Sequence, residues 1–406
     1  MFENTTKPTP VRMAYIGCWY KNDMYSHNCS GLVDSLRDTG MQVDVITSNC
    51  RCFSSAQRLG ISPEELINQN CSAVTLPHAP RNPGRSHGVA KQLVVKALRL
   101  DFWLAIIRGF LFYKRARRAD VIHFDQVLEA FGCVPFFVLL ILASVTGEQV
   151  VVTVHEIDPF QRKHKWLNRL YARCAETLVY SDNMKEQLVA LGAPSHKVHV
   201  IKYGTEIPKL TGAARQNYLF FGGHFILHGK GYAELLDALV LVKQRGVKIN
   251  TVIYVGHGCN GLKDAKELAE GKHLSDVLEW QEFYTRDQLA NVYQASKVCI
   301  VPFTGGSARH PLSCAMVNAT PVIATRKADI PEYLGDLGIY VDGSAKSIAD
   351  AICQIENGAV DLVTLGKNLR EKAISELDYH KIAEELSGMY SKVSANQPLV
   401  QINEAA

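Results

Sequence analysis

Short runs of β-branched and other apolar residues alternate with helix-length segments through almost the whole chain. The runs are continuous rather than alternately polar and apolar, which is typical of parallel strands buried on both faces. Parallel strands need helical crossovers, so the pattern predicts doubly wound α/β sheets covered by helices. Twelve strands are predicted, at 12–16, 43–47, 121–124, 150–154, 177–180 and 198–201, and then at 218–221, 250–255, 277–280, 298–302, 321–324 and 338–341.

The pattern restarts after residues 205–216, a segment with Pro208, Gly212 and little apolar content. A length of 406 residues suits two cores rather than one, because domains cluster at roughly 100–200 residues. Ligands bind beyond the carboxyl ends of strands in such sheets, so the cleft between two domains is the expected site. We predict a first Rossmann-like domain over 1–207, a second over 208–378, a helix over 379–395 that crosses back to the first domain, and a flexible tail over 396–406.

Composition limits the function classes. A formal net charge of +4 is too small to indicate a nucleic-acid partner, and no RNA- or DNA-binding motif is present, so none is expected. The 11 cysteines form no CxxC pair and the N-terminus lacks a signal peptide, which favours a reduced, cytoplasmic protein. No apolar run reaches the roughly 20 residues of a spanning helix. Residues 131–145, which include Pro135, are predicted to form a buried or membrane-grazing helix.

Residues 91–118 carry eight lysines and arginines against the single acidic Asp101, interleaved with aromatic and aliphatic residues. Such a stretch suits the surface of an anionic bilayer, where each cation contributes about 1 kcal/mol. It predicts peripheral attachment to the inner face of the membrane. The alternative is that these helices pack on the first sheet and leave only a solvated basic edge.

Five ordered blocks of the chain resemble the GT4 family of retaining GT-B glycosyltransferases. They are LVYSDNMKEQLVALGAPSHKVHVIKYG at 178–204, FFGGHFILHGKG at 220–231, YVGHG at 254–258, TRDQLANVYQASKVCIVPF at 285–303 and TPVIATRKADIPEYLGDLGIYVD at 320–342. The resemblance implies a GT-B fold, two Rossmann-like domains facing across a cleft. It also implies transfer of a sugar from a nucleotide-diphosphate donor to a glycan or lipid-linked acceptor, with retention.

The donor side of the predicted site lies in the second domain. A sugar transfer needs stabilisation of the leaving diphosphate, which cations and helix N-termini can supply. Lys230 lies in a glycine-rich turn where its ammonium can reach a phosphate, and a solvated loop lysine is the alternative. Gly222, Gly223 and Gly256 belong to the same expected surface. His224 stands where the family commonly has an arginine, and a mostly neutral histidine cannot form the guanidinium fork.

The family's Glu-x7-Glu motif is not preserved. An ungapped alignment of residues 304–325 puts Gly306 and Cys314 at the two glutamate positions, which in the family contact the donor sugar and the ribose. What remains is a Gly-Gly-Ser turn before a helix predicted to start near residue 311. Backbone N–H groups there could hold a phosphate, and Ser307, Arg309 and Ser313 are polar in this segment. An ordinary loop before a buried helix is the alternative.

The acceptor side is expected at the carboxyl ends of the first sheet. His155 ends the strand at 150–154 in a T-x-H context that the family often uses to face the transferred sugar. A histidine satisfied within the core is the alternative. Glu156 follows and could contact the acceptor or the donor sugar, or lie in a solvated turn. Larger groups replace the family's Gly-Gly loop after Gly17, and their rings suit stacking on a sugar; they include Trp19, Tyr25 and His27.

No cofactor or metal is expected besides the nucleotide-diphosphate sugar, since the sequence has no DxD motif or His/Asp metal cluster. Two alternatives remain open. With both glutamates absent, the chain could be a noncatalytic pseudo-glycosyltransferase that scaffolds or regulates a glycan-synthesis complex. It could also keep the fold and nucleotide but act as a sugar-nucleotide epimerase.

Overall fold

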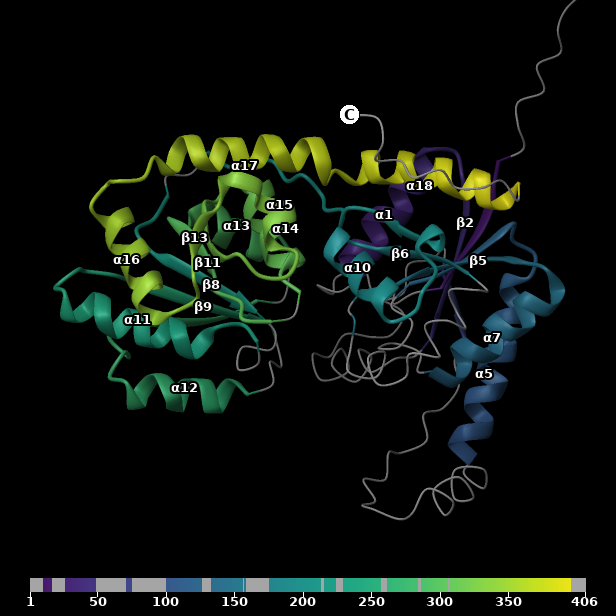
Figure 1. Cartoon of the computed structure of the whole chain (residues 1–406), viewed down its shortest axis with the longest axis horizontal. Coiled ribbons are helices and arrows are strands. Elements are labelled where there is room, and N and C mark those ends of the chain that lie inside the picture. Colours follow the sequence, from purple (N-terminus) through teal and green to yellow (C-terminus); the bar gives the residue numbers. More distant parts are fainter. Residues whose placement is uncertain are drawn as a thin grey trace, which may run out of the picture.

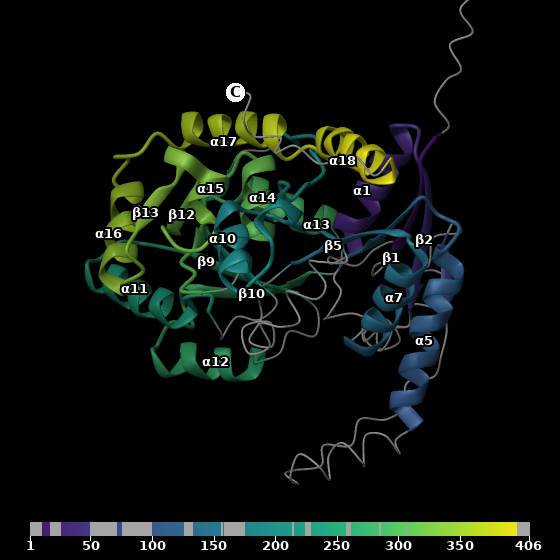
Figure 2. The same cartoon turned by 45° about the vertical axis from the view of Figure 1, so that its right-hand side comes forward.

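The computed structural model describes residues 10–16, 26–48, 71–74, 100–125, 133–155, 157, 175–212, 215–223, 229–256, 261–283, 286–305 and 307–395. Two α/β halves lie side by side, each a parallel sheet with helices on both faces (Figure 1). The last two helices, α17 Leu362–Glu376 and α18 Tyr379–Ser394, run along one side of the molecule and connect the halves (Figure 1 and Figure 2).

The first half contains a seven-stranded sheet with strand order β3-β2-β1-β4-β5-β6-β7. Its strands are β1 Arg12–Ile16, β2 Gln42–Ser48, β3 Cys71–Val74, β4 Val121–Phe124, β5 Gln149–Thr153, β6 Glu176–Val179 and β7 Val198–Val200. Its helices are α1 Ser26–Asp38, α5 Leu100–Ala116, α7 Cys133–Thr146 and α10 Asp182–Ala190, with a 3-10 turn at Ser195–Lys197. All neighbouring strands are parallel.

The second half repeats this plan with six parallel strands in the order β10-β9-β8-β11-β12-β13. The strands are β8 Leu219–Gly223, β9 Thr251–Gly256, β10 Leu278–Phe283, β11 Val298–Val301, β12 Val322–Thr325 and β13 Ile339–Val341. The helices are α11 Tyr232–Gln244, α12 Leu262–Gly271, α13 Arg286–Ala295, α14 Arg309–Val317, α15 Ile330–Leu334 and α16 Ala345–Glu356, with a 3-10 turn at Gly335–Leu337. Helices α17 Leu362–Glu376 and α18 Tyr379–Ser394 follow.

Each sheet has a separate apolar core on each face. On the first sheet, α5, α7 and α10 cover one face, and α1 and α18 cover the other. On the second sheet, α11, α12 and α16 cover one face, and α13, α14, α15 and α17 cover the other. Because each fully buried aliphatic side chain contributes about 1.5–3 kcal/mol, double coverage explains why the strands read as continuous apolar runs.

The ring of Tyr379 holds the start of α18, after the crossover from α17, against the first half. Asp378 accepts a hydrogen bond from the first-turn N–H of His380 and so caps α18. The next residue, Tyr379, packs its ring against Gly31 of α1 and Gly204, where a Cβ would overlap with the ring. The two glycines therefore let α18 lie close against the first half, where it joins α1 and β4.

All twelve predicted strands are present, most within one or two residues of their predicted ends. Strand β3, with the sequence CSAV, was not predicted. Its only β-branched residue is Val74, so it carries little strand signal, and it pairs with a single neighbour at the edge of the sheet.

The strand orders place a topological switch point in each half. The adjacent strands β1 and β4 send their following helices to opposite faces of the first sheet, and β8 and β11 do the same in the second. Loops that diverge in this way leave a crevice at the carboxyl ends of the strands, where α/β proteins bind ligands.

Candidate functional site

The second switch point joins two segments that are far apart in the sequence. The backbone N–H groups of Thr304 and Gly305, which follow β11, both donate to the carbonyl oxygen of Gly229, which follows β8, over 3.1 Å. Gly231 has a φ of 70°, and a Cβ there would overlap with the carbonyl oxygen of Pro302. The close approach of the two loops therefore requires glycine in the turn.

Lys230 lies between these glycines. Its Nζ donates to the carbonyl oxygen of Ser307 over 3.0 Å and lies 4.0 Å from the ring centroid of Phe303. The expected phosphate-binding lysine and the Gly-Gly-Ser turn, 77 residues apart in the sequence, are thus neighbours at the crevice.

Two helices begin beside Lys230, and neither N-cap residue forms a side-chain cap hydrogen bond: it is Gly231 in α11 and Ala308 in α14. In α14 the hydroxyl oxygen of Ser307 accepts a hydrogen bond from Arg309 N over 3.4 Å. First-turn N–H groups carry the positive end of the helix dipole and need external acceptors. Together with the ammonium of Lys230, the two N-termini form a site suited to a phosphate group.

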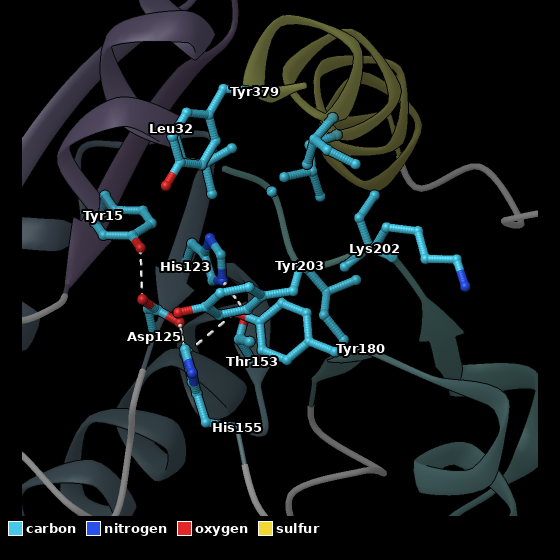
Figure 3. A pocket seen from close by; sticks show the side chains of 15 residues that line it. Tyr15, Leu32, His123, Asp125, Thr153, His155, Tyr180, Lys202, Tyr203 and Tyr379 are labelled. Carbon is cyan, nitrogen blue, oxygen red and sulfur yellow. Dashed lines mark hydrogen bonds and ion pairs between the residues drawn. The ribbon is translucent and has the colours of Figure 1, made fainter. Parts of the chain in front are cut away.

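The first half has a small cavity of about 30 Å³ at the carboxyl ends of its strands. Figure 3 shows Tyr15, Asp125 and His155 converging from neighbouring strands, with Tyr180 and Tyr203 beside them. Among the described residues, the lining consists of Tyr15, Leu32, His123, Asp125, Thr153, His155, Leu178, Tyr180, Ile201, Lys202, Tyr203, Gly204, Tyr379, Ile382 and Leu386. The cavity thus combines aromatic walls with a buried set of ionisable groups.

Asp125 is the centre of this set. Tyr15 donates its hydroxyl hydrogen to Oδ2 of Asp125 over 2.6 Å, and His155 Nε2 lies 2.5 Å from Oδ1. Burial raises the pKa of Asp125, but the charge of His155, its hydrogen bond, the charge of His123 and the Tyr15 hydroxyl lower that pKa more. Asp125 is therefore an ionised, buried carboxylate.

His123 lies deeper, and its ring is fully paired. Its Nδ1 lies 2.8 Å from the hydroxyl oxygen of Tyr390, and its Nε2 lies 2.7 Å from Oγ1 of Thr153. Burial lowers the pKa of His123 to about 4, against the smaller raising effect of Asp125. The imidazole is neutral near pH 7 and serves as a structural hydrogen-bonding group.

Arg309, at the start of α14, crosses from the second half to the first. Its guanidinium donates to Oδ2 of Asp329 over 2.7 Å, to Sδ of Met184 over 3.0 Å, and to the carbonyl oxygen of His155. It also lies 5.0 Å from the ring centroid of Tyr180. Because these groups hold it in the interface, Arg309 would have to leave Asp329 to contact a donor phosphate.

Helix α15 supplies a second connection between the halves. Both carboxylate oxygens of Glu332 accept hydrogen bonds from the N-terminus of α10, over 2.7 Å from Asp182 N and 3.0 Å from Asn183 N. Tyr333 donates its hydroxyl hydrogen to the carbonyl oxygen of Tyr180 over 3.2 Å. A carboxylate at a helix N-terminus is favourable, so this contact helps to fix how the two crevices face each other.

The other predicted donor residues have mixed surroundings. Gly222 lies in β8, and Gly256 ends β9. Cys314 is partly buried on α14, with its sulfur 3.7 Å from Nε2 of His310. Ser313 is fully buried, and within the described residues its hydroxyl has no hydrogen-bond partner. Ser313 thus lies inside the domain in this conformation.

Several predicted residues lie outside the described part of the chain: Gly17, Trp19, Tyr25, Glu156, His224 and Gly306. Gly223 belongs to β8, and the backbone of His27 belongs to α1. Helix α14 starts at Arg309, two residues before the predicted start.

Sequence reasoning missed Asp125, Tyr15 and Tyr180. The signal was available for Asp125, because it directly follows the predicted strand at 121–124, beside the strand that carries His155. Carboxyl ends of neighbouring parallel strands lie at one edge of a sheet, so a polar residue there is a natural neighbour of His155.

Among the residues that the structure describes, no three His, Cys, Asp or Glu side chains are grouped to hold a metal ion. In the same part of the chain, no helix is long and apolar enough to cross a membrane. Cys299, Cys314 and Cys353 are free thiols.

Two family descriptions match the chain: "Glycosyltransferase Family 4" over residues 29–207 and "Glycosyl transferases group 1" over residues 215–357. The amylovoran biosynthesis glycosyltransferase AmsK of Erwinia amylovora is 23% identical over 272 residues, which are 62% of this chain and 66% of that protein. The match therefore spans slightly less than two thirds of this relative's length.

Solved structures share the architecture. Sucrose-phosphate synthase from Thermosynechococcus elongatus has a TM-score of 0.71 at 16% identity, over 95% of this chain and 100% of that one. Anabaena HepE, in complex with UDP and glucose, has a TM-score of 0.68 at 16% identity, over 94% and 100% of the two chains. At this identity the likeness shows the fold, and it confirms the predicted GT-B class.

Two doubly wound domains with a switch point in each define a GT-B protein. The two family matches span both domains, and the chain belongs to the GT4-like glycosyltransferases of the GT-B fold.

Proposed function

We propose that this protein transfers a sugar from a nucleotide-diphosphate donor to a glycan or lipid-linked acceptor, with retention and without a metal ion. The observation that carries the proposal is the position of Lys230 at the second switch point, beside the N-termini of α11 and α14. AmsK is named for amylovoran biosynthesis, and HepE was solved with UDP and glucose. These relatives support a role in polysaccharide biosynthesis and make UDP-sugars the first donors to test.

In the proposed reaction the bond between the anomeric carbon and the diphosphate oxygen breaks, and the acceptor oxygen bonds to the anomeric carbon on the same face. As the first bond breaks, negative charge builds up on the diphosphate, where the ammonium of Lys230 and the N–H groups of α11 and α14 stabilise it. The leaving diphosphate oxygen then takes the acceptor's proton. His155, on the opposite wall, faces the transferred sugar.

Substitutions of Lys230 and His155 should affect donor binding and turnover differently. Lys230→Ala should weaken donor binding about 10- to 100-fold, the value of a hydrogen-bonded charge, whereas His155→Ala should lower kcat more than donor affinity. Lys346→Ala, an exposed lysine of the same domain, is the control. Calorimetric titration and a coupled assay with UDP-, GDP- and ADP-sugars measure both quantities, with and without EDTA.

The outcomes distinguish the candidate functions. Unchanged kinetics in both variants would refute the site, and an inverted product or a strict requirement for Mn²⁺ would refute the proposed chemistry. No transfer, no donor hydrolysis and no thermal shift with any nucleotide would favour the noncatalytic scaffold.

We further propose that the protein attaches peripherally to the cytoplasmic, anionic membrane surface through the region of residues 91–118. Within the described part of this region, Trp103, Ile107 and Phe110 form an exposed row on α5 at a spacing of four and three residues. Trp103 is 53% exposed and Phe110 is 50% exposed. Such an apolar row is unusual on a solvated helix.

Helix α7, which packs against α5, also exposes apolar side chains. It contains no charged residue in its 14 positions, and Ile141 and Val145 are exposed. The two helices pack closely because Gly109 of α5 lies against the backbone of Pro135, where a Cβ would come within 2.6 Å of the carbonyl oxygen. Figure 1 shows α5 and α7 together at the edge of the first half that is remote from the second.

Cations adjoin the apolar surface. The row on α5 continues to Lys114 and Arg115 in its last turn, and Arg117 and Arg118 follow. Apolar side chains next to a basic cluster suit the acyl boundary and the headgroups of an anionic bilayer. This charge complementarity favours a lipid surface over a protein partner.

Vesicle co-sedimentation tests the attachment. The protein should bind phosphatidylcholine vesicles that contain phosphatidylglycerol, and Trp103→Ser with Phe110→Ser should release it. Val363→Ser, which removes an apolar side chain exposed on α17 in the other half, should leave binding unchanged. Binding that survives both the serine pair and charge reversal at Arg115, Arg117 and Arg118 would refute this surface.

A further inference from the structure

The carboxylate of Asp125 has two defined donors. It is buried at the end of β4, where Oδ2 accepts the Tyr15 hydroxyl hydrogen over 2.6 Å and Oδ1 lies 2.5 Å from His155 Nε2 (Figure 3). Burial raises the pKa of Asp125, and the hydrogen bonds from both donors help to hold that pKa below its ordinary range. An ionised carboxylate can only accept hydrogen bonds.

The proton in the short contact must therefore belong to His155. A neutral imidazole that carries its hydrogen on Nε2 has an acceptor lone pair on Nδ1. The only hydrogen-bond partners of the ring within the described residues are at Nε2, namely Asp125 and, at 3.3 Å, the Tyr180 hydroxyl. Nδ1 is thus the nitrogen available to a ligand.

The position of the ring is fixed from several sides. The ring of Tyr180 packs edge-on with its centroid 5.0 Å from that of His155. The backbone of His155 is held from the second half, where Arg309 donates to its carbonyl oxygen. The ring itself is mostly buried, so the hydrogen bond to Asp125 decides which nitrogen faces outward.

His123, the other histidine in this cavity, has no ring nitrogen available to a ligand. Both of its nitrogens are already paired, with Tyr390 and with Thr153. The lowered pKa of His123 keeps it neutral near pH 7, so His123 places no positive charge beside the carboxylate.

We propose that Asp125 is a positioning residue that holds His155 with its hydrogen on Nε2, so that Nδ1 accepts a hydrogen bond from a sugar hydroxyl in the cleft. This role of Asp125 rests on the proposed sugar transfer. Asp125 acts through His155, and Tyr15 keeps the carboxylate in place.

Nitrogen-15 NMR of histidine-labelled protein tests the tautomer directly, with His155→Gln to assign the signals. The wild type should show hydrogen on Nε2 of His155. In Asp125→Asn this preference should be lost and kcat should fall about 10- to 100-fold, a typical effect of removing a group that orients an imidazole, while the donor KM changes much less. A ring with its hydrogen on Nδ1 in the wild type would overturn the proposal.

Tyr390→Phe is the matched control, because it removes a buried hydrogen bond to His123 and should leave the His155 signals and kcat unchanged. Tyr15→Phe tests the network if Asp125→Asn does not fold, and it should lower kcat by a smaller factor while His155 keeps its tautomer. Unaltered kcat in both Asp125→Asn and Tyr15→Phe would overturn the positioning role. Failure of the wild type to bind or turn over any donor would instead refute the proposed function, and the tautomer would still be measured.

Discussion

Arg309 and Asp329 form a buried ion pair within the second half, and this pair holds the guanidinium that contacts Met184 and the His155 carbonyl oxygen in the first half. The two side chains are only 5% and 3% exposed, and the N–O distance is 2.7 Å. Asp329→Ala would leave the guanidinium buried without its carboxylate, which typically costs about 3–5 kcal/mol. Asp329 forms no side-chain cap bond to α15, so loss of a helix cap adds nothing to this value.

For a domain of this size the loss corresponds to a fall in Tm on the order of 10 °C. Asp276→Ala is the control, since it removes an exposed partner at 2.6 Å from Lys243 in the same domain, and exposed pairs contribute little. The double variant Arg309→Met with Asp329→Ala should recover part of the stability, because it removes the unpaired charge.

Urea unfolding followed by circular dichroism and scanning calorimetry measure these differences. If Asp329→Ala is no more destabilising than Asp276→Ala, the argument from burial is wrong. The single variant Arg309→Met completes the comparison. If the loss in the free energy of unfolding of the double variant equals the sum of the losses of Arg309→Met and Asp329→Ala, the two side chains are not coupled.

Two further predictions concern pH and the donor loop. Since burial lowers the pKa of His123 from 6.5 to about 4, the unfolded chain binds an extra proton between these values. The free energy of unfolding should therefore fall as the pH is lowered across that window, by about 3 kcal/mol in all. Urea midpoints in His123→Gln should depend less on pH, and equal slopes would contradict this. Gly231→Ala should displace the turn against Pro302 and weaken donor binding like Lys230→Ala, whereas Gly246→Ala, with an open Cβ position at a φ of 75°, should change only stability.

Much of the fold follows from local sequence. Continuous apolar runs at regular spacing predict twelve of the strands and their parallel direction, because strands of parallel sheets are typically buried on both faces. Strand β3 escaped prediction because CSAV lacks the β-branched run of the others. The packing of α18 depends on Gly31 and Gly204, which are 173 residues apart and meet only through Tyr379; such a contact has no local signal.

Site residues that belong to a local sequence motif were predictable, and those that depend on distant partners were not. Lys230 and the Gly-Gly-Ser turn were each recognisable, and the adjacency of β8 and β11 explains why they meet. The environment of Arg309 was not predictable, since its partners Asp329 and His155 come from two different domains. A cation in a loop looks the same in sequence whether it faces a phosphate or a buried carboxylate.

The altered Glu-x7-Glu motif leads to a last prediction. Where the family's second glutamate contacts the ribose, this chain has Cys314, whose sulfur lies 3.7 Å from His310 Nε2. A thiol is a much weaker acceptor than a carboxylate, so a ribose hydroxyl should gain little there. Under the proposed function, donor affinity should then depend mainly on the diphosphate at Lys230. The nucleoside diphosphate that binds best should therefore lose less than about 3-fold in affinity when its 2′-hydroxyl is removed, and Cys314→Glu should widen that difference. A wild-type loss of about 10-fold or more, the value of a hydrogen bond to a charged group, would mean that another residue has taken over the glutamate's role.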